Sequence, residues 1–336
     1  MHVDLTNSMT YNLGPTVQPE RFLALRSVVA NVASLLGTCS PVLAQVPDPQ
    51  SDTGPPPPAE ASRDPVLDGI NSSFAFPVDQ LLRRKHDSDF ANLLDGLTVT
   101  PTIGIPLASE QAGAQTTGAL NSASAVVNVT LRYQPVGYWF AQTTIYSYLQ
   151  PDRRAPWNPD FTYSFGYDDW HPYTFSLVYS NYANNRFSPR QGNPVTPLGH
   201  GTVSLGWKAP MPSRLARLFL VEEGRQINCR IGLNTSPRFD REDGSSGKWK
   251  TSANLGCRYP FTDRLFVDVN LFAYAHGQQP WDPDYTYSFG LFDYRSNRFS
   301  IQYANYSGNR FPGRTRSPRS GRFRDGGISI SWNHGF

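Results

Sequence analysis

One stretch of this chain, residues 156–187, returns without a gap as residues 280–311. The first copy reads PWNPDFTYSFGYDDWHPYTFSLVYSNYANNRF and the second reads PWDPDYTYSFGLFDYRSNRFSIQYANYSGNRF. In both, aromatic side chains alternate with small or polar ones, which is the period of a β-strand whose successive side chains point to opposite faces. A supersecondary unit repeated in register indicates internal duplication. The repeat therefore predicts a β-hairpin that the chain builds twice.

Alternation of this kind continues from residue 95 to the last residue. It predicts strands of an all-β fold at 97–107, 123–133, 137–149, 160–168, 173–183, 201–208, 226–236, 248–259, 264–275, 284–292, 297–307 and 327–336. Each is close to the roughly nine to eleven residues with which a tilted strand crosses a membrane. One face of each strand is apolar, as at Val127 and Val129, and the other is polar, as at Asn128 and Thr130. Such apolar faces meet in the core of a soluble sandwich, whereas they face lipid in a transmembrane barrel.

The connections between these strands favour the barrel. Short turns at 134–137, 169–172, 260–263 and 293–297 alternate with longer loops at 108–122, 150–159, 184–199, 237–247 and 307–326. Short turns on one rim and long loops on the other are typical of outer-membrane barrels, where they are periplasmic and extracellular respectively. Aromatic residues near strand ends suit girdles at the two membrane surfaces. The candidates are Tyr138, Trp139, Trp157, Trp170, Trp207, Trp249, Trp281 and Trp332.

The last strand, GISISWNHGF, ends on an aromatic residue, Phe336. With these strands, turns and terminus, residues 95–336 resemble a bacterial outer-membrane β-barrel protein. The resemblance implies a Gram-negative outer membrane, contact with lipid and lipopolysaccharide, and recognition of Phe336 by the barrel-assembly machinery. It leaves function open, because barrels of this size include channels and lipid-modifying enzymes.

The duplication extends beyond the repeated hairpin. Asn128, Arg132 and Tyr133 align with Asn254, Arg258 and Tyr259, at nearly the offset of the long repeat. We therefore expect an antiparallel transmembrane barrel of about twelve strands in two six-strand halves. The halves would be joined by residues 210–224, with a helical turn at 213–221.

The N-terminal part reads as an export and linker region. Residues 1–44 have the basic, apolar and small-residue order of a signal peptide. Residues 45–94 then combine a Pro-rich linker with an amphipathic pattern at 78–94 that predicts a short helix. This segment is a candidate contact for a periplasmic partner.

Polar-face positions of the predicted strands supply candidate residues for a solute pathway in the lumen. The charged ones are Arg132, Lys208, Arg230, Lys250, Arg258, Asp168 and Asp268. Fixed cations raise the local concentration of anions, and guanidinium groups recognise carboxylates. A porin-like channel for small anionic or saccharide solutes is the first hypothesis, although the same charges could simply pair with one another and fill the barrel. An enzyme acting on lipid A or phospholipid is one alternative, and an accessory for polymer export or complex docking is another.

The cluster Asp168, Asp169, Trp170 and His171 invites an acid/base or metal interpretation. The second copy keeps only one of its Asp residues, as Asp293, and turns ordinarily contain Asp. We therefore expect no catalytic residue, no metal and no cofactor, and any specialised function at the point where the copies differ.

Three smaller features complete the prediction. Arg310, Arg314, Arg316, Arg319, Arg322 and Arg324 lie in one long loop, where lipopolysaccharide phosphate is the nearest polyanion and nucleic acid is not expected. Cys229 and Cys257 fall on apolar faces of neighbouring strands, either as a disulfide or as two small hydrophobic residues. The repeated Asn-Arg-Phe at 185–187 and 309–311 suits a structural role, and Asp160 and Asp284 would cap the turns that lead into their strands.

Overall fold

The computed structural model describes residues 64–74, 94–107, 124–154, 158–182, 185–187, 197–219, 225–262, 264–292, 298–306, 309–314 and 322–335. The chain divides into two compact units, 1–60 and 61–336, and all described residues belong to the second. Several predicted features lie outside the described residues. They are the signal peptide, the Pro-rich linker and the predicted 78–94 helix, of which only Leu94 is described. The single residues Trp157, Asp293, Arg316, Arg319 and Phe336 also lie outside the described residues.

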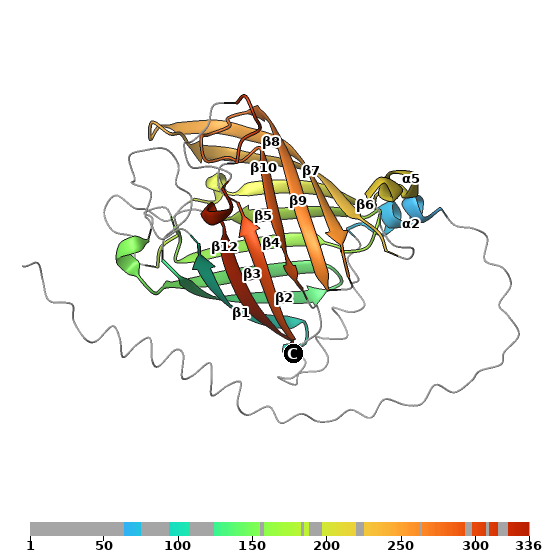
Figure 1. Ribbon diagram of the computed structural model, residues 1–336, viewed down its shortest axis with the longest axis horizontal. Helices are drawn as coiled ribbons and strands as arrows, with labels where there is room; N and C mark the ends of the chain where they lie inside the picture. Colours follow the sequence, from blue (N-terminus) through green and yellow to red (C-terminus); the bar gives the residue numbers. More distant parts are fainter. Residues whose placement is uncertain are drawn as a thin grey trace, which may run out of the picture. The chain divides into compact units, whose positions relative to one another are not determined.

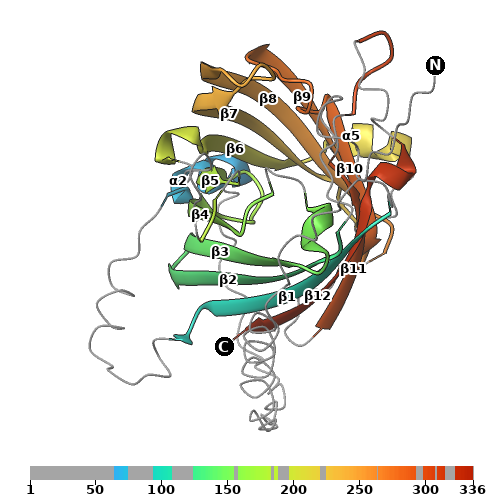
Figure 2. The ribbon, with the colours of Figure 1, turned by 90° about the vertical axis from the view of Figure 1, so that its left-hand side faces the viewer.

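Twelve strands in this part of the chain form a closed antiparallel barrel (Figure 1). They are β1 (Leu97–Pro106), β2 (Val126–Val136), β3 (Trp139–Tyr148), β4 (Phe161–Asp168), β5 (Phe175–Asn181), β6 (Thr202–Pro210), β7 (Asn228–Asp240), β8 (Ser246–Pro260), β9 (Leu265–His276), β10 (Tyr285–Leu291), β11 (Arg298–Asn305) and β12 (Gly327–Gly335). Each strand pairs with its neighbours in sequence, and β1 pairs with β12 to close the ring (Figure 2). The predicted fold class is confirmed.

The hairpin of β7 and β8 is longer than predicted. A loop was expected at 237–247, but Arg238 pairs with Lys248 and Asp240 with Ser246, which leaves only a tight turn. Pro237 can stay in the strand because it breaks the ladder only locally. The ring of Phe239 is buried beside Gly247, where a side chain would collide with it, and this packing supports the extension seen in Figure 1.

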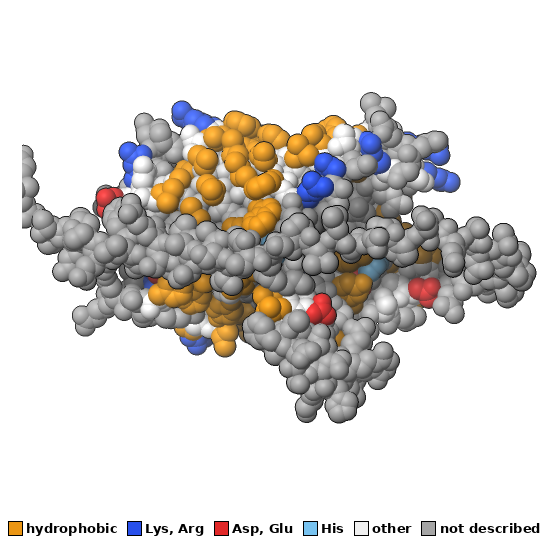
Figure 3. Space-filling model, turned by 90° about the horizontal axis from the view of Figure 1, so that it is seen from below, with side chains coloured by type: hydrophobic (Ala, Val, Ile, Leu, Met, Phe, Trp, Pro, Cys, Tyr) orange, Lys and Arg blue, Asp and Glu red, His pale blue; other side chains and the backbone are white. Residues whose placement is uncertain are grey.

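The outward face of the barrel is apolar and exposed. Its large hydrophobic side chains include Ile103, Ile105, Ile145, Phe165, Leu177, Leu205, Ile231, Leu233, Leu255, Leu265, Val269, Leu271, Phe289, Leu291, Ile301, Ile328 and Ile330. Figure 3 shows hydrophobic side chains gathered over one side of the molecule. A water-soluble monomer rarely exposes so large an apolar area. A closed barrel with this surface is consistent with the outer-membrane type. No helix among the described residues is long and apolar enough to cross a membrane.

The repeated motifs close the loops at the long-loop rim in the same way. The carboxylate of Asp284 accepts hydrogen bonds from the Phe311 backbone N–H (3.0 Å) and from Arg310 (3.0 Å). In the other copy, Asp160 accepts from the Phe187 N–H (3.1 Å) and from Arg186 (3.4 Å). The structural role predicted for Asn-Arg-Phe is therefore confirmed, with each Asp as its partner.

Short helical segments lie in the connections outside the strands, including 3₁₀ turns at Pro151–Arg153, Leu198–His200 and Phe323–Asp325. The connection after β6 contains α5 (Ser213–Ala216) and a 3₁₀ turn (Arg217–Phe219), as predicted. Helix α2 (Pro65–Ser72) was not predicted, although its Asp64 N-cap and first-position proline are ordinary start signals. It ends against the short-turn rim, where Phe74 packs 5.1 Å from the ring of Tyr167.

Cys229 and Cys257 form a disulfide between β7 and β8. The two residues are direct partners in the antiparallel ladder, with Cα atoms 4.1 Å apart. Of the two alternatives left open by the sequence, the structure shows the cross-link. It lies on the outward face, next to the short-turn rim.

Candidate solute pathway

Three of the predicted lumen cations are paired with carboxylates. Lys208 Nζ lies 2.7 Å from Asp168, and it also donates to the Asp169 carbonyl. Arg258 Nε lies 3.1 Å from Asp268. Lys250 lies 2.9 Å from a residue that the sequence did not single out, Asp282. The expectation that the predicted lumen charges pair with one another therefore holds for Lys208 and Arg258, while Lys250 pairs with a carboxylate outside that set.

The other two cations, Arg132 and Arg230, form no ion pair with a described residue. The guanidinium carbon of Arg132 lies 3.8 Å from the ring centroid of Phe140, and Arg132 Nη1 is 3.5 Å from the Gln142 amide oxygen. Arg230 reaches across β6 and donates to the Ser176 hydroxyl (2.9 Å). Neither guanidinium is neutralised by an ion pair with a described carboxylate, although the field of Asp168 also acts on Arg132.

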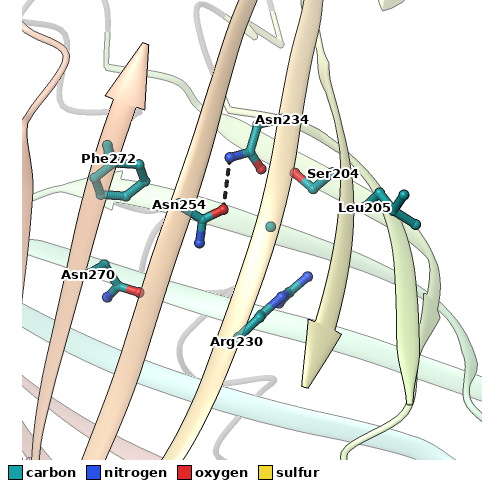
Figure 4. A pocket seen from close by; sticks show the side chains of 8 residues that line it. Ser204, Leu205, Arg230, Asn234, Asn254, Asn270 and Phe272 are labelled. Atoms are coloured by element: carbon teal, nitrogen blue, oxygen red, sulfur yellow. Dashed lines mark hydrogen bonds between the residues drawn. The ribbon is translucent and has the colours of Figure 1, made fainter. Parts of the chain in front are cut away.

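A pocket of about 190 Å³ opens in the lumen wall formed by β6 to β9 (Figure 4). Its lining is one cation, several carboxamides and one aromatic ring. The residues are Ser204, Leu205, Arg230, Gly232, Asn234, Asn254, Asn270 and Phe272. Asn234 Nδ2 donates to Asn254 Oδ1 at 3.0 Å, shown as the dashed line in Figure 4. Such a lining offers donors, acceptors and a flat apolar surface to one small polar solute.

Glycines on adjacent strands give these polar side chains their room. A Cβ on Gly232 would lie 2.3 Å from Asn254 Oδ1, and one on Gly256 would lie 2.1 Å from Asn270 Oδ1. The asparagine side chains therefore lie flat along the wall instead of standing upright in the lumen. Arg230 lies over Gly206 in the same way, with its Nε 2.4 Å from the position of a Cβ.

The sequence identified Arg230 as a pathway residue but missed the rest of this pocket as a site. Asn234, Asn254 and Asn270 lie on the polar faces of their strands, but the sequence did not single them out as site residues. Phe272 occupies the lumen-facing phase of β9, because Asp268 and Asn270 share its alternation. The sequence did contain one indication of the pocket, an aromatic residue at a position of β9 that alternation assigns to the polar face. It was missed because the residues on either side of Phe272 are also apolar.

Asp168 to His171 lie at the short-turn rim, as predicted. His171 Nδ1 lies 2.7 Å from Asp169, and the Trp170 ring stacks on the His171 ring with centroids 3.8 Å apart. Tyr167 also donates to the Asp169 carboxylate (3.2 Å). This is an oriented Asp–His pair, but among the described residues none hydrogen bonds the other nitrogen of His171. The arrangement therefore supplies an orienting carboxylate and a base without a nucleophile.

Within the described part of the arginine-rich loop, the arginines differ in burial. Arg310 is held by Asp284 and by the carbonyls of Gln279 and Pro280, and its side chain is only 8% exposed. Arg314 also contacts Asp284 (3.2 Å) but is 52% exposed. Burial alone would raise the pKa of Asp284, but hydrogen bonds from Phe311, Gln278 and Arg310 outweigh it and hold the pKa below its usual value. Arg322 and Arg324 lie in the exposed segment that leads into β12.

Comparison with protein-family models found no match, and comparison with curated proteins found none either.

Proposed function

We propose that this chain is an outer-membrane channel of porin type for small solutes, with a preference for anionic and saccharide ones. The observation that carries the proposal is the pair of lumen arginines without a carboxylate partner among the described residues, Arg132 and Arg230, the second of them in a carboxamide-rich pocket. A barrel of twelve strands is compatible with such a channel. Unpaired guanidinium groups in a narrow lumen favour anions through their field and bind carboxylates with directed hydrogen bonds.

Liposome swelling tests this function. Liposomes containing the protein would be placed in isotonic arabinose, gluconate or glucosamine hydrochloride. Swelling should be fastest in gluconate, slower in arabinose and slowest in glucosamine. Swelling no faster than that of protein-free liposomes with all three solutes would contradict the proposal.

An enzyme acting on lipid A or phospholipid is the second candidate, and the Asp169–His171 contact is the observation that favours it. The channel is preferred because the pair lacks a described nucleophile. Replacement of His171 by Ala, with Asp168→Asn beside it, should leave lipid A and phospholipid profiles unchanged if the chain is a channel. A changed lipid profile with a folded barrel would favour the enzyme instead.

The proposed contacts of the barrel follow from its location. Lipopolysaccharide phosphates would bind the exposed arginines of the last long loop, with Arg314, Arg322 and Arg324 better placed than the buried Arg310. The C-terminal Phe336 would serve the barrel-assembly machinery. A periplasmic partner, as in polymer export, would bind residues 45–94, and a pull-down with that segment deleted tests this, because retention of every partner would exclude it.

A further inference from the structure

Two pairs of aromatic residues stand on the lumen face of the barrel. Tyr146 and Tyr148 stack along β3 with ring centroids 6.5 Å apart, and Phe272 and Tyr274 stack along β9 at 6.4 Å. Lumen-facing positions in a channel ordinarily carry polar residues. Two aromatic residues at successive lumen-facing positions of one strand have no apolar core to fill. We call each such pair an aromatic ladder, because its rings form a row of flat surfaces along the lumen wall.

The two pairs are copies of one another. On each strand the aromatic pair comes after a phenylalanine that is covered by an arginine of the preceding strand. This phenylalanine is Phe140 under Arg132 on β3 and Phe266 under Arg258 on β9. β3 and β9 are six strands apart in the ring of twelve, so the ladders face each other. A strand spacing of about 4.8 Å and a tilt of about 40° place the two backbones roughly 24 Å apart. Each ladder is therefore a separate binding surface.

The β3 ladder is occupied by the protein itself. Arg154 places its guanidinium carbon 4.3 Å from the ring centroid of Tyr148, and the Tyr148 hydroxyl donates to the Pro159 carbonyl (3.1 Å). No cation among the described residues covers the ring of Phe272 or Tyr274. Phe272 borders the lumen pocket, so the Phe272 end of the second ladder is accessible to a ligand.

The second ladder also continues into the pocket. Phe272 forms part of the pocket wall, and Asn254, Asn270 and Arg230 line the same pocket (Figure 4). Aromatic faces bury the C–H surfaces of a sugar ring, carboxamides form hydrogen bonds with its hydroxyls, and a guanidinium donates hydrogen bonds to a carboxylate. The combination distinguishes a saccharide from a simple inorganic anion, which gains nothing from the aromatic rings.

We propose that the β9 wall binds a saccharide chain whose rings lie over Phe272 and Tyr274 and whose hydroxyls contact Asn254 and Asn270. Arg230 then selects chains that carry a carboxylate, so hexuronate oligosaccharides are the preferred ligand class. The inference rests on the proposed function, because it needs a lumen that solutes enter. It goes further by assigning the solute and the wall that holds it.

Isothermal titration calorimetry on the detergent-purified protein tests the binding site without any need for conduction. The probes are neutral gluco-oligosaccharides and hexuronate oligosaccharides of one to six units. Affinity should rise with length and level off once both rings are covered, and the hexuronates should bind more tightly. Phe272→Ala should weaken binding by up to about tenfold, the upper end of what one aromatic contact contributes.

Matched variants separate the site from general damage. Phe165→Ala removes an outward-facing ring, and Tyr148→Ala removes the ring on β3 that Arg154 covers. Both variants should retain wild-type affinity. If Phe272→Ala fails to fold, as judged by heat-modifiable migration, Phe272→Leu keeps the apolar volume and removes only the flat face. Weakened binding in Phe272→Leu and retained binding in Phe272→Tyr are the expected results.

The outcomes distinguish this inference from the function on which it rests. Conductance without saccharide binding would leave the channel standing and overturn the inference. Saccharide binding without conductance would support the site and reject the channel. Binding that is indifferent to Phe272 and Tyr274 would overturn the inference in either case.

Discussion

The guanidinium group of Arg132 lies over the ring of Phe140, with its carbon 3.8 Å from the ring centroid. The same contact recurs on the opposite wall between Arg258 and Phe266, at 4.4 Å. The duplication has therefore placed one stacked cation on each side of the lumen. They differ in one partner, because Arg132 faces the neutral Gln142 and Arg258 faces Asp268.

This difference predicts unequal effects on ion selectivity. Arg132→Ala removes a cation that has no carboxylate partner among the described residues, so chloride permeability relative to potassium should fall by about threefold to fivefold, as expected for loss of roughly 1 kcal/mol of screened attraction. Arg258→Ala leaves the Asp268 carboxylate without its partner and should shift selectivity towards cations. Reversal potentials in a salt gradient measure both variants.

The double variant Arg258→Ala, Asp268→Asn is the control for this prediction. It removes both charges of one pair and should restore selectivity close to that of the wild type. If Arg132→Ala leaves the reversal potential unchanged, the lumen arginines do not select ions.

Asp284 predicts a pH-dependent loop closure. Its pKa is held below the ordinary value of about 3.9, so the carboxylate stabilises the folded loops above that pH and loses this contribution as the pH falls through the lower, folded value. Limited proteolysis should therefore cleave near 277–284 and 309–314 more readily at pH 2.5 than at pH 7. Asp284→Asn should show that cleavage already at pH 7.

The matched variant is Asp160→Asn in the other copy. Asp284 is fully buried while the Asp160 side chain is 21% exposed, and removal of one partner from a buried pair costs about 3 to 5 kcal/mol, more than for an exposed pair. Equal protease sensitivity of the two variants would argue against a buried clamp at Asp284.

The disulfide predicts a measurable contribution to barrel stability. A cross-link that closes a loop of this size contributes about 2 to 4 kcal/mol, mainly by restricting the unfolded chain. The variant Cys229→Ala, Cys257→Ala should unfold at a lower temperature in a gel assay of heat-modifiable migration. Reductant should lower the wild-type midpoint and leave the variant unaffected, whereas a reductant-insensitive wild type would show that the bond does not form.

The glycine beneath Asn270 predicts a steric block. Gly256→Val places a side chain 2.1 Å from the amide oxygen of Asn270, which must then rotate into the lumen. Single-channel conductance should fall while the barrel remains folded. Gly335→Ala is the control, since nothing lies within 4 Å of its new Cβ. Unchanged conductance in Gly256→Val would show that Asn270 does not border the path.

Much of this barrel could be predicted from the sequence, because alternation of period two gives each strand its two faces. The duplicated motif also predicted a structural role for Asn-Arg-Phe and turn caps at Asp160 and Asp284, but it did not predict that these motifs bond to one another. The extension of β7 and β8 was missed because Pro237 resembles a break. The ring of Phe239 packs near Gly247 and Gly277, which lie beyond the turn, and alternation along one strand does not reveal that packing.

The pocket could not be predicted because it depends on register. Gly232 lies opposite Asn254, and Gly256 lies opposite Asn270, and a one-residue shift would separate both pairs. Hairpin length alone does not determine such a register. The covered state of Tyr148 depends similarly on Arg154, a loop residue whose position no alternation predicts.

Single-channel recording across a planar lipid bilayer, with potassium chloride at unequal concentrations on the two sides, tests the central claim most directly. The purified barrel should produce discrete conductance steps, and its reversal potential should be displaced from zero towards the chloride equilibrium potential. The double variant Arg132→Ala, Arg230→Ala should have a reversal potential closer to zero. Absence of discrete conductance at every voltage, in protein shown to be folded, would contradict a channel.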